Sequence, residues 1–106
     1  MKYVVEFAPE ALAQLAAIDD FIAIASAPEI AERYVDGIIG YCMTLTTFPL
    51  GAISRDDLMP GLRITNHLSR SIVAYTVNSE ARIISIVGVF YGGQEYEASL
   101  AIAITK

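Results

Sequence analysis

Residue types that carry common active-site chemistry are scarce in this chain of 106 residues, which has one cysteine, one histidine and two lysines, Lys2 and Lys106. A single cysteine cannot form an internal disulfide, and the N-terminal MKYVVEFAPEAL lacks a long hydrophobic region, so we expect a cytoplasmic protein. No apolar run approaches the roughly 18 residues of a membrane helix, so no membrane association is expected. With a net charge of −5 the chain is expected to be a poor general nucleic-acid binder, because affinity for phosphates depends on cationic side chains.

The lone histidine and the lone cysteine offer little to catalysis. His67 has no second His or Cys at ligand spacing, so we expect neither a metal nor another cofactor. It could act as a general base or be an exposed residue at the end of a hairpin, and the absence of a partner favours the second interpretation. Cys42 falls on the apolar face of a predicted helix and is interpreted as a buried structural thiol. No residue is assigned a catalytic role.

Residues 82–97, RIISIVGVFYGGQEYE, contain the most strongly apolar and β-branched run of the chain. Such residues favour a pleated strand, and the lack of alternation predicts an interior strand that is covered on both faces. Gly92 and Gly93 then predict a turn, beyond which the chain becomes polar and aromatic.

The remaining patterns predict one α+β domain over residues 1–106. Alternation predicts strands at 2–7, 62–67 and 71–77, and apolar steps of four and three predict helices over 10–25 and from about 29 to 48. Ser26 and Glu29 have the spacing of a capping box for the second helix. The order is β-α-α-β-β-β with a short C-terminal segment. Short loops imply an antiparallel meander, and the N-terminal strand joins this four-stranded sheet by a crossover beneath a helical hairpin.

Three arginines, Arg63, Arg70 and Arg82, lie on or beside the predicted meander. They could gather into a local positive patch in spite of the acidic total, or they could be ordinary solvent-facing residues.

Taken in order, these segments resemble the ParE branch of the ParE/RelE toxin superfamily of bacterial toxin–antitoxin systems. The resemblance spans nearly the whole chain and rests on YVVEFAPEAL, IDDFIA, SAPEIAERYVDGI, RDDLMPGLR, IVAYTV and VFYGGQEYE. Members of this superfamily share the β-α-α-β-β-β order.

The resemblance implies a toxin that inhibits DNA gyrase, binds no DNA by itself and is held in a hetero-oligomer by a ParD-like antitoxin. One alternative is a RelE-like, ribosome-dependent mRNA endonuclease, for which Tyr91, Tyr96, His67 and Arg63 would have to supply the chemistry. Another alternative is a non-toxic module that only binds the antitoxin. Many ParE-like chains have basic residues where this one has Gly92 and Gly93.

Two surfaces are predicted from these considerations. Surplus apolar residues of the helices are expected to bind the antitoxin, namely Phe21, Ile24, Ile30, Tyr34 and Tyr41. Arginines of the sheet and polar or aromatic residues of the closing segment are expected to bind the target, namely Arg63, Arg70, Arg82, Tyr91, Gln94 and Tyr96.

Overall fold

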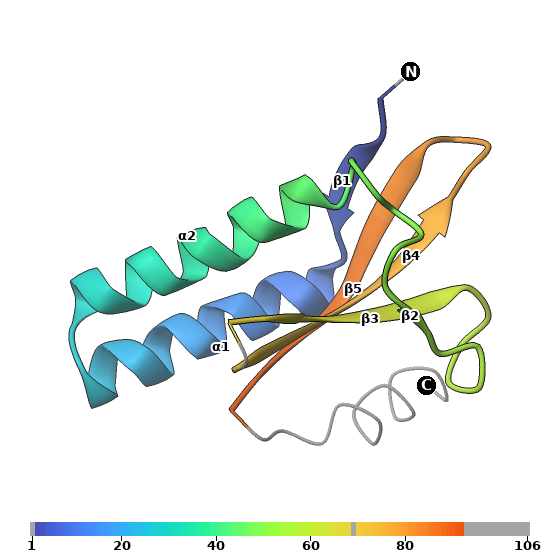
Figure 1. Cartoon of the computed structure of the whole chain (residues 1–106). Coiled ribbons are helices and arrows are strands. Elements are labelled where there is room, and N and C mark those ends of the chain that lie inside the picture. Colours follow the sequence, from blue (N-terminus) through green and yellow to red (C-terminus); the bar gives the residue numbers. More distant parts are fainter. Residues whose placement is uncertain (1, 69, 93–106) are drawn as a thin grey trace.

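Two helices lie over one face of a mixed sheet in the computed structural model, which describes residues 2–68 and 70–92 (Figure 1). The elements are β1 (Val4–Phe7), α1 (Pro9–Ala25), α2 (Pro28–Thr44), β2 (Ile53–Ser54), β3 (Leu62–His67), β4 (Ser71–Asn78) and β5 (Ile83–Tyr91). The strand order is β1-β5-β4-β3-β2. Strands β2 to β5 pair antiparallel, whereas β1 pairs parallel with β5, from Val4 beside Ile83 to Phe7 beside Ile86. This arrangement confirms the predicted α+β class, the crossover and the meander.

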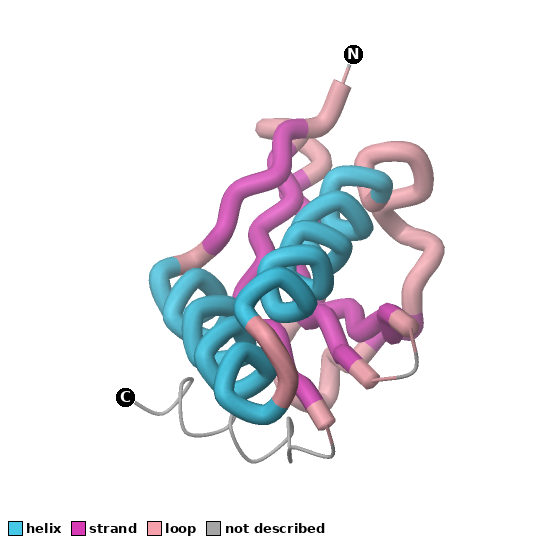
Figure 2. The backbone as a smooth tube through the Cα atoms, turned by 90° about the vertical axis from the view of Figure 1, so that its left-hand side faces the viewer, coloured by secondary structure: helices cyan, strands magenta, loops and turns pink. Residues whose placement is uncertain are grey.

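The two helices form an antiparallel hairpin because each begins directly after a break and carries one core-facing stripe. A proline stands in the first turn of each helix, where its missing N–H costs no hydrogen bond. The buried residues of the helices are Ala11, Leu15, Ile18, Ile22, Ala31, Ile38 and Cys42. Figure 2 shows both helices on the same side of the strands. Among the described residues, no helix is both long and apolar enough to cross a bilayer.

The sheet is buried on both faces. Toward the helices it presents Val73, Tyr75, Ile84, Ile86 and Val89, which pack with the helix stripes. The other face carries a second cluster, made by Leu62, Ile64, Ala74 and Phe90 with Leu58 and Met59 of the preceding loop. Because β5 lies between β1 and β4 and contributes to both clusters, it is the doubly covered interior strand that its composition predicts.

A β-bulge interrupts the pairing of β5 with β4. Ala74 lies opposite Gly88 while Tyr75 lies opposite Ile86, so Val87 is an extra residue in β5. One extra residue in β5 reverses the face of the sheet to which each following side chain points. Ile84 and Ile86 face the helices before the bulge, and Val89 faces them after it. The bulge therefore decides which side chains of β5 face the helices along the length of the strand.

Helix α1 is tied to the strand beyond the bulge by a hydrogen bond from side chain to backbone. β1 pairs with β5 only as far as Ile86, after which the chain turns into α1. Farther along β5, the N–H of Val89 donates to Oε1 of Gln14 at 2.7 Å. A glutamine of the helix thus provides the acceptor for a strand amide that lies beyond the end of the paired β1 segment.

Two details differ from the sequence-based expectations. The predicted connection 51–61 contains a fifth strand, β2, whose two residues are too few to show an alternating pattern. The predicted capping box at Ser26 is wrong, because α2 has Ala27 as its N-cap and no side chain caps it.

Gly88→Ala is expected to destabilise the fold by about 1–3 kcal/mol, as overpacking in cores generally does. A Cβ at this position would lie 2.8 Å from two ring carbons of Phe90, whose buried ring has little room to move. Gly40→Ala is the matched control, since a Cβ there meets nothing within 4 Å in the middle of α2, and it should stabilise by about 0.5–1 kcal/mol. Urea denaturation measures both. Equal effects of the two substitutions would contradict the packing at the bulge.

Candidate functional site

One end of the sheet presents a row of polar and aromatic side chains to the helices. His67 pairs with Ser71, and Ser71 pairs with Tyr91, so these residues stand side by side on β3, β4 and β5. Helix α2 lies over the row through two tyrosines. The hydroxyl of Tyr34 shares a hydrogen bond with Oγ of Ser71, and the hydroxyl of Tyr41 meets Oγ1 of Thr65 at 2.7 Å. This end of the α2–sheet interface is therefore joined by polar contacts.

The rings at this end form a continuous series across four elements. Phe21 of α1 lies 5.9 Å from Tyr91 between ring centroids, and Tyr91 lies 5.3 Å from Tyr34 in an edge-on arrangement. His67 follows, 6.3 Å from Tyr34 and 5.0 Å from Tyr41. Aromatic pairs at such separations contribute beyond their buried area. The series links both helices to β3 and β5.

His67 is half-buried against α2, which overturns its interpretation as an exposed end of a hairpin. Gly37 of α2 makes room for it, since a Cβ at that position would lie 3.7 Å from His67 Nε2. The Nε2 atom is enclosed and has no hydrogen-bond partner among the described residues. Burial lowers the pKa of His67 below its ordinary value of 6.5. Burial thus favours the neutral form of the side chain, and the enclosed Nε2 is not available to a substrate at the surface.

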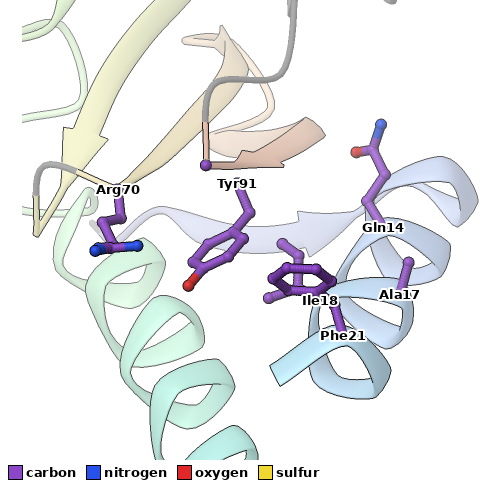
Figure 3. A pocket seen from close by; sticks show the side chains of 7 residues that line it. Gln14, Ala17, Ile18, Phe21, Arg70 and Tyr91 are labelled. Atoms are coloured by element: carbon purple, nitrogen blue, oxygen red, sulfur yellow. The ribbon is translucent and has the colours of Figure 1, made fainter. Parts of the chain in front are cut away.

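A groove of about 460 Å³ opens beside this row, between α1 and the end of β5 (Figure 3). Its lining comes from Gln14, Ala17, Ile18, Phe21, Arg70, Tyr91 and Gly92. Most of this lining is apolar, and among the lining residues that the structure describes Arg70 is the one that carries a charge. Figure 3 shows the ring of Tyr91 between Arg70 and Phe21. We call this feature the Phe21–Tyr91 groove.

Of the two alternatives for the three arginines, the structure does not show a shared positive patch, because they lie at different positions along the sheet. Arg63 faces α2 near the middle of the sheet, where its Nη1 donates to the carbonyls of Leu50 at 3.0 Å and Ala52 at 2.8 Å. Arg82 immediately precedes β5, with its guanidinium 5.9 Å from the ring centroid of Tyr3. Tyr91 is at the opposite end of that strand, about 3.3 Å per residue away. Only Arg70 comes together with Tyr91.

The residues that the sequence predicts for antitoxin binding divide into two groups. Phe21, Ile24 and Ile30 are exposed, with 61%, 87% and 48% of their surface accessible. Tyr34 and Tyr41 instead turn inward and bond to the sheet. Gln94 and Tyr96, predicted for target binding, lie outside the described residues.

Sequence reasoning named Phe21 on α1 but missed Gln14, Ala17 and Ile18, which line the groove with it. Gln14, Ala17, Phe21 and Ile24 recur at steps of three, four and three, which places them on one helix face beside the core stripe. That spacing was available in the sequence. Because Ala17 is small and Gln14 is polar, the stripe does not stand out as apolar in the sequence. The bulge that brings Tyr91 to the same side of the sheet has no sequence signal as strong as this spacing.

Cys42 and Asp56 have structural surroundings. Burial raises the pKa of the Cys42 thiol to about 12, so it is unreactive near neutral pH. Within residues 2–68 and 70–92, no three His, Cys, Asp or Glu side chains are grouped so that they could hold a metal ion. Asp56 accepts hydrogen bonds from the Gly61 N–H and the Ser54 hydroxyl, and these hold the pKa of its carboxyl below the usual value.

Residues 5–96 match the family model described as the ParE toxin of the type II toxin–antitoxin system parDE. The chain belongs to this family. It is therefore a toxin of the type II class, as the resemblance in its sequence indicates. No curated protein is similar enough to the chain to match it.

Solved toxin structures share the fold at low sequence identity. A chain of the chromosomal ParDE system of P. aeruginosa is 21% identical with a TM-score of 0.72, and the match covers 85% of this chain and 96% of that one. A chain of the RelBE2 toxin–antitoxin complex of Mycobacterium tuberculosis is 16% identical, with a TM-score of 0.63 and coverage of 86% and 99%. A free mutant of E. coli RelE is 15% identical, with a TM-score of 0.67 and coverage of 100% of both chains. At these identities the likeness shows the fold alone.

The buried His67 should make the stability of the toxin depend on pH. In the unfolded chain this histidine binds a proton near its ordinary pKa, whereas its lowered pKa in the fold delays protonation to a lower pH. The stability due to neutral burial is thus present above pH 6.5 and is lost as the pH falls through the folded-state pKa. We expect a lower urea midpoint at about pH 5.5 than at about pH 7.5, and a smaller difference in His67→Gln.

Tyr41→Phe serves as the control for this measurement. It removes the hydroxyl that meets Thr65, at a cost of about 1 kcal/mol, but it leaves the histidine in place. Its pH dependence should therefore match that of the wild type. A His67→Gln protein with the full wild-type pH dependence would show that other groups are responsible.

Proposed function

We propose that this toxin inhibits DNA gyrase by binding it, and that a ParD-like antitoxin neutralises the toxin in a hetero-oligomeric complex. The observation that carries the proposal is the match of residues 5–96 to the ParE family. The likeness to a chain of the P. aeruginosa ParDE system agrees with it. We also propose that the protein acts in the cytoplasm, because gyrase acts there.

The chemistry of the described residues favours binding over catalysis. Cleavage of RNA through its 2′-hydroxyl needs an accessible base and cations that stabilise the charged phosphorane. Of the residues that the endonuclease alternative requires, His67 has its Nε2 enclosed, and Arg63 is bonded to two carbonyls of the preceding loop. Tyr91 packs among other rings. These positions support a toxin that acts through an interface.

The target-binding surface is best supported around Arg70 and Tyr91. Arg70 is exposed in the turn between β3 and β4, and its carbonyl accepts a hydrogen bond from the N–H of Gly92, which holds this turn beside the end of β5. Arginine and tyrosine are enriched among the residues that anchor interfaces. Gln94 and Tyr96 continue the chain from Gly92 and remain candidates for the same surface. Arg63 and Arg82 are less suitable because each is placed elsewhere on the sheet.

The exposed apolar side chains of the helical hairpin support an antitoxin contact. Phe21 and Ile24 on α1 and Ile30 on α2 leave much of their surface accessible near the tip of the hairpin. Such patches on small proteins mark interaction sites. Tyr34 and Tyr41 bond to the sheet, so they would contribute little accessible area to an antitoxin contact.

Arg70→Ala should reduce gyrase inhibition roughly tenfold or more, since loss of one interface anchor costs about 1.4 kcal/mol or more. The assay measures supercoiling by gyrase with ATP, and the trapped cleavage product, over a range of toxin concentrations. Arg33→Ala is the matched control, because Arg33 is an exposed arginine on α2 outside the groove, and its inhibition should be unchanged.

Three outcomes would lead away from this proposal. Wild-type toxin that leaves supercoiling intact would remove gyrase as the target. Codon-positioned cuts in mRNA during growth arrest would favour the RelE-like endonuclease. Expression without growth arrest would favour a module that only binds its antitoxin. Full inhibition by a folded Arg70→Ala protein would leave the target but move the binding surface away from Arg70.

A further inference from the structure

Helix α1 carries a second stripe that the fold of the described residues does not bury. The core stripe is Ala11, Leu15, Ile18 and Ile22, and the second stripe, Gln14, Ala17, Phe21 and Ile24, lies beside it. Within the second stripe Phe21 and Ile24 are 61% and 87% exposed. A helix of a small domain ordinarily has one apolar face toward the core and a polar face toward water. A second apolar stripe indicates a further contact.

Three members of the second stripe, Gln14, Ala17 and Phe21, form one wall of the Phe21–Tyr91 groove together with Ile18 of the core stripe. The other lining residues are Tyr91 and Gly92 at the end of β5 and Arg70, which lies beside Tyr91 on the side away from Phe21. The volume of about 460 Å³ is within the range of about 300–1,000 Å³ that is usual for ligand sites. The walls are held firmly, since Gln14 is bonded to the Val89 N–H and Tyr91 packs on Phe21 and Tyr34. These contacts within the fold hold both walls of the groove in place.

The lining defines the chemistry of the occupant. Phe21, Ile18, Ala17 and the ring of Tyr91 suit an aliphatic or aromatic side chain. Within residues 2–68 and 70–92, the charged residue of the lining is Arg70, and its guanidinium suits a carboxylate that follows or precedes that side chain. The complementary ligand is therefore a peptide segment in which a large apolar residue stands next to Asp or Glu.

We propose that the Phe21–Tyr91 groove is where the antitoxin anchors, by inserting one large apolar side chain between α1 and β5 while a neighbouring carboxylate pairs with Arg70. This inference rests on the proposed function, because it takes the antitoxin as the partner. It goes beyond the proposed function because it names the groove on the toxin, the apolar side chain that the antitoxin inserts and the negative charge beside that side chain. It also assigns a role to Gln14, Ala17 and Ile18, which the sequence did not single out.

Ala17→Trp tests the groove by filling it. The probe is the purified ParD-like antitoxin of the proposed complex, and its affinity for each toxin variant is measured by calorimetry. We expect Ala17→Trp to weaken binding at least tenfold. Ala16→Trp is the matched control, because Ala16 is also exposed on α1 but points about 100° away from Ala17 and does not line the groove. Its affinity should stay within about twofold of wild type.

Arg70→Glu tests the charge. It should weaken binding by at least tenfold and reduce the dependence of affinity on salt, whereas Arg33→Glu should do neither. A protease digest of the wild-type complex should further protect an antitoxin segment that contains a large apolar residue next to an acidic one.

The outcomes separate this inference from the proposal on which it rests. No binding of the probe to wild-type toxin removes the antitoxin partner, and with it the groove's occupant. Binding that is equally strong with Ala17→Trp and Arg70→Glu overturns the groove while the partner remains. Ala17→Trp that turns a dimer of isolated toxin into a monomer assigns the groove to a second copy. Ala17→Trp that destabilises the isolated toxin much more than Ala16→Trp assigns it to the chain itself.

Discussion

The extra residue at Val87 determines which side chains the end of β5 presents to the helices. Without it, strict alternation from Ile84 and Ile86 would place Tyr91 on the opposite face of the sheet. With it, Val89 joins the helix-facing core, and Tyr91 packs between Phe21 and Tyr34. Gln14 supports the same arrangement from α1 by accepting the Val89 N–H. The aromatic row, the groove and the approach of Arg70 to Tyr91 all follow from this one irregularity.

The sequence predicts the elements well because their periods are strong. The core stripes of the helices recur at steps of four and three, and the order of long and short connections leaves few topologies for the sheet. The residues around β5 were harder to place, because a bulge depends on pairing with β4 and is not encoded in a local pattern. The same reason explains the arginines. Arg63, Arg70 and Arg82 are close in the order of strands, but register puts them near the middle, one end and the other end of the sheet.

The tyrosines of α2 show a second limit of sequence reasoning. Tyr34 and Tyr41 fall beside the core stripe and were predicted to be available to a partner. The sheet beneath them is polar at this end, with Thr65, His67 and Ser71 on the helix-facing side. A tyrosine can cover such a surface with its ring and satisfy a hydroxyl at its tip, which a leucine cannot do. Polar residues of β3 and β4, which follow α2 in the chain, thus turn the side chains of Tyr34 and Tyr41 toward the sheet.

The geometry also brings together residues that sequence reasoning assigned to two separate surfaces. Phe21 was predicted to bind the antitoxin, and Arg70 and Tyr91 to bind the target, yet all three line one groove. A partner chain seated in the Phe21–Tyr91 groove covers the two rings, which pack against each other, and the guanidinium beside them. If the antitoxin anchors there, the residues proposed for gyrase are buried in the same complex. Neutralisation then requires no change in the shape of the toxin, because occupation of one groove by the antitoxin is enough to exclude the target from it.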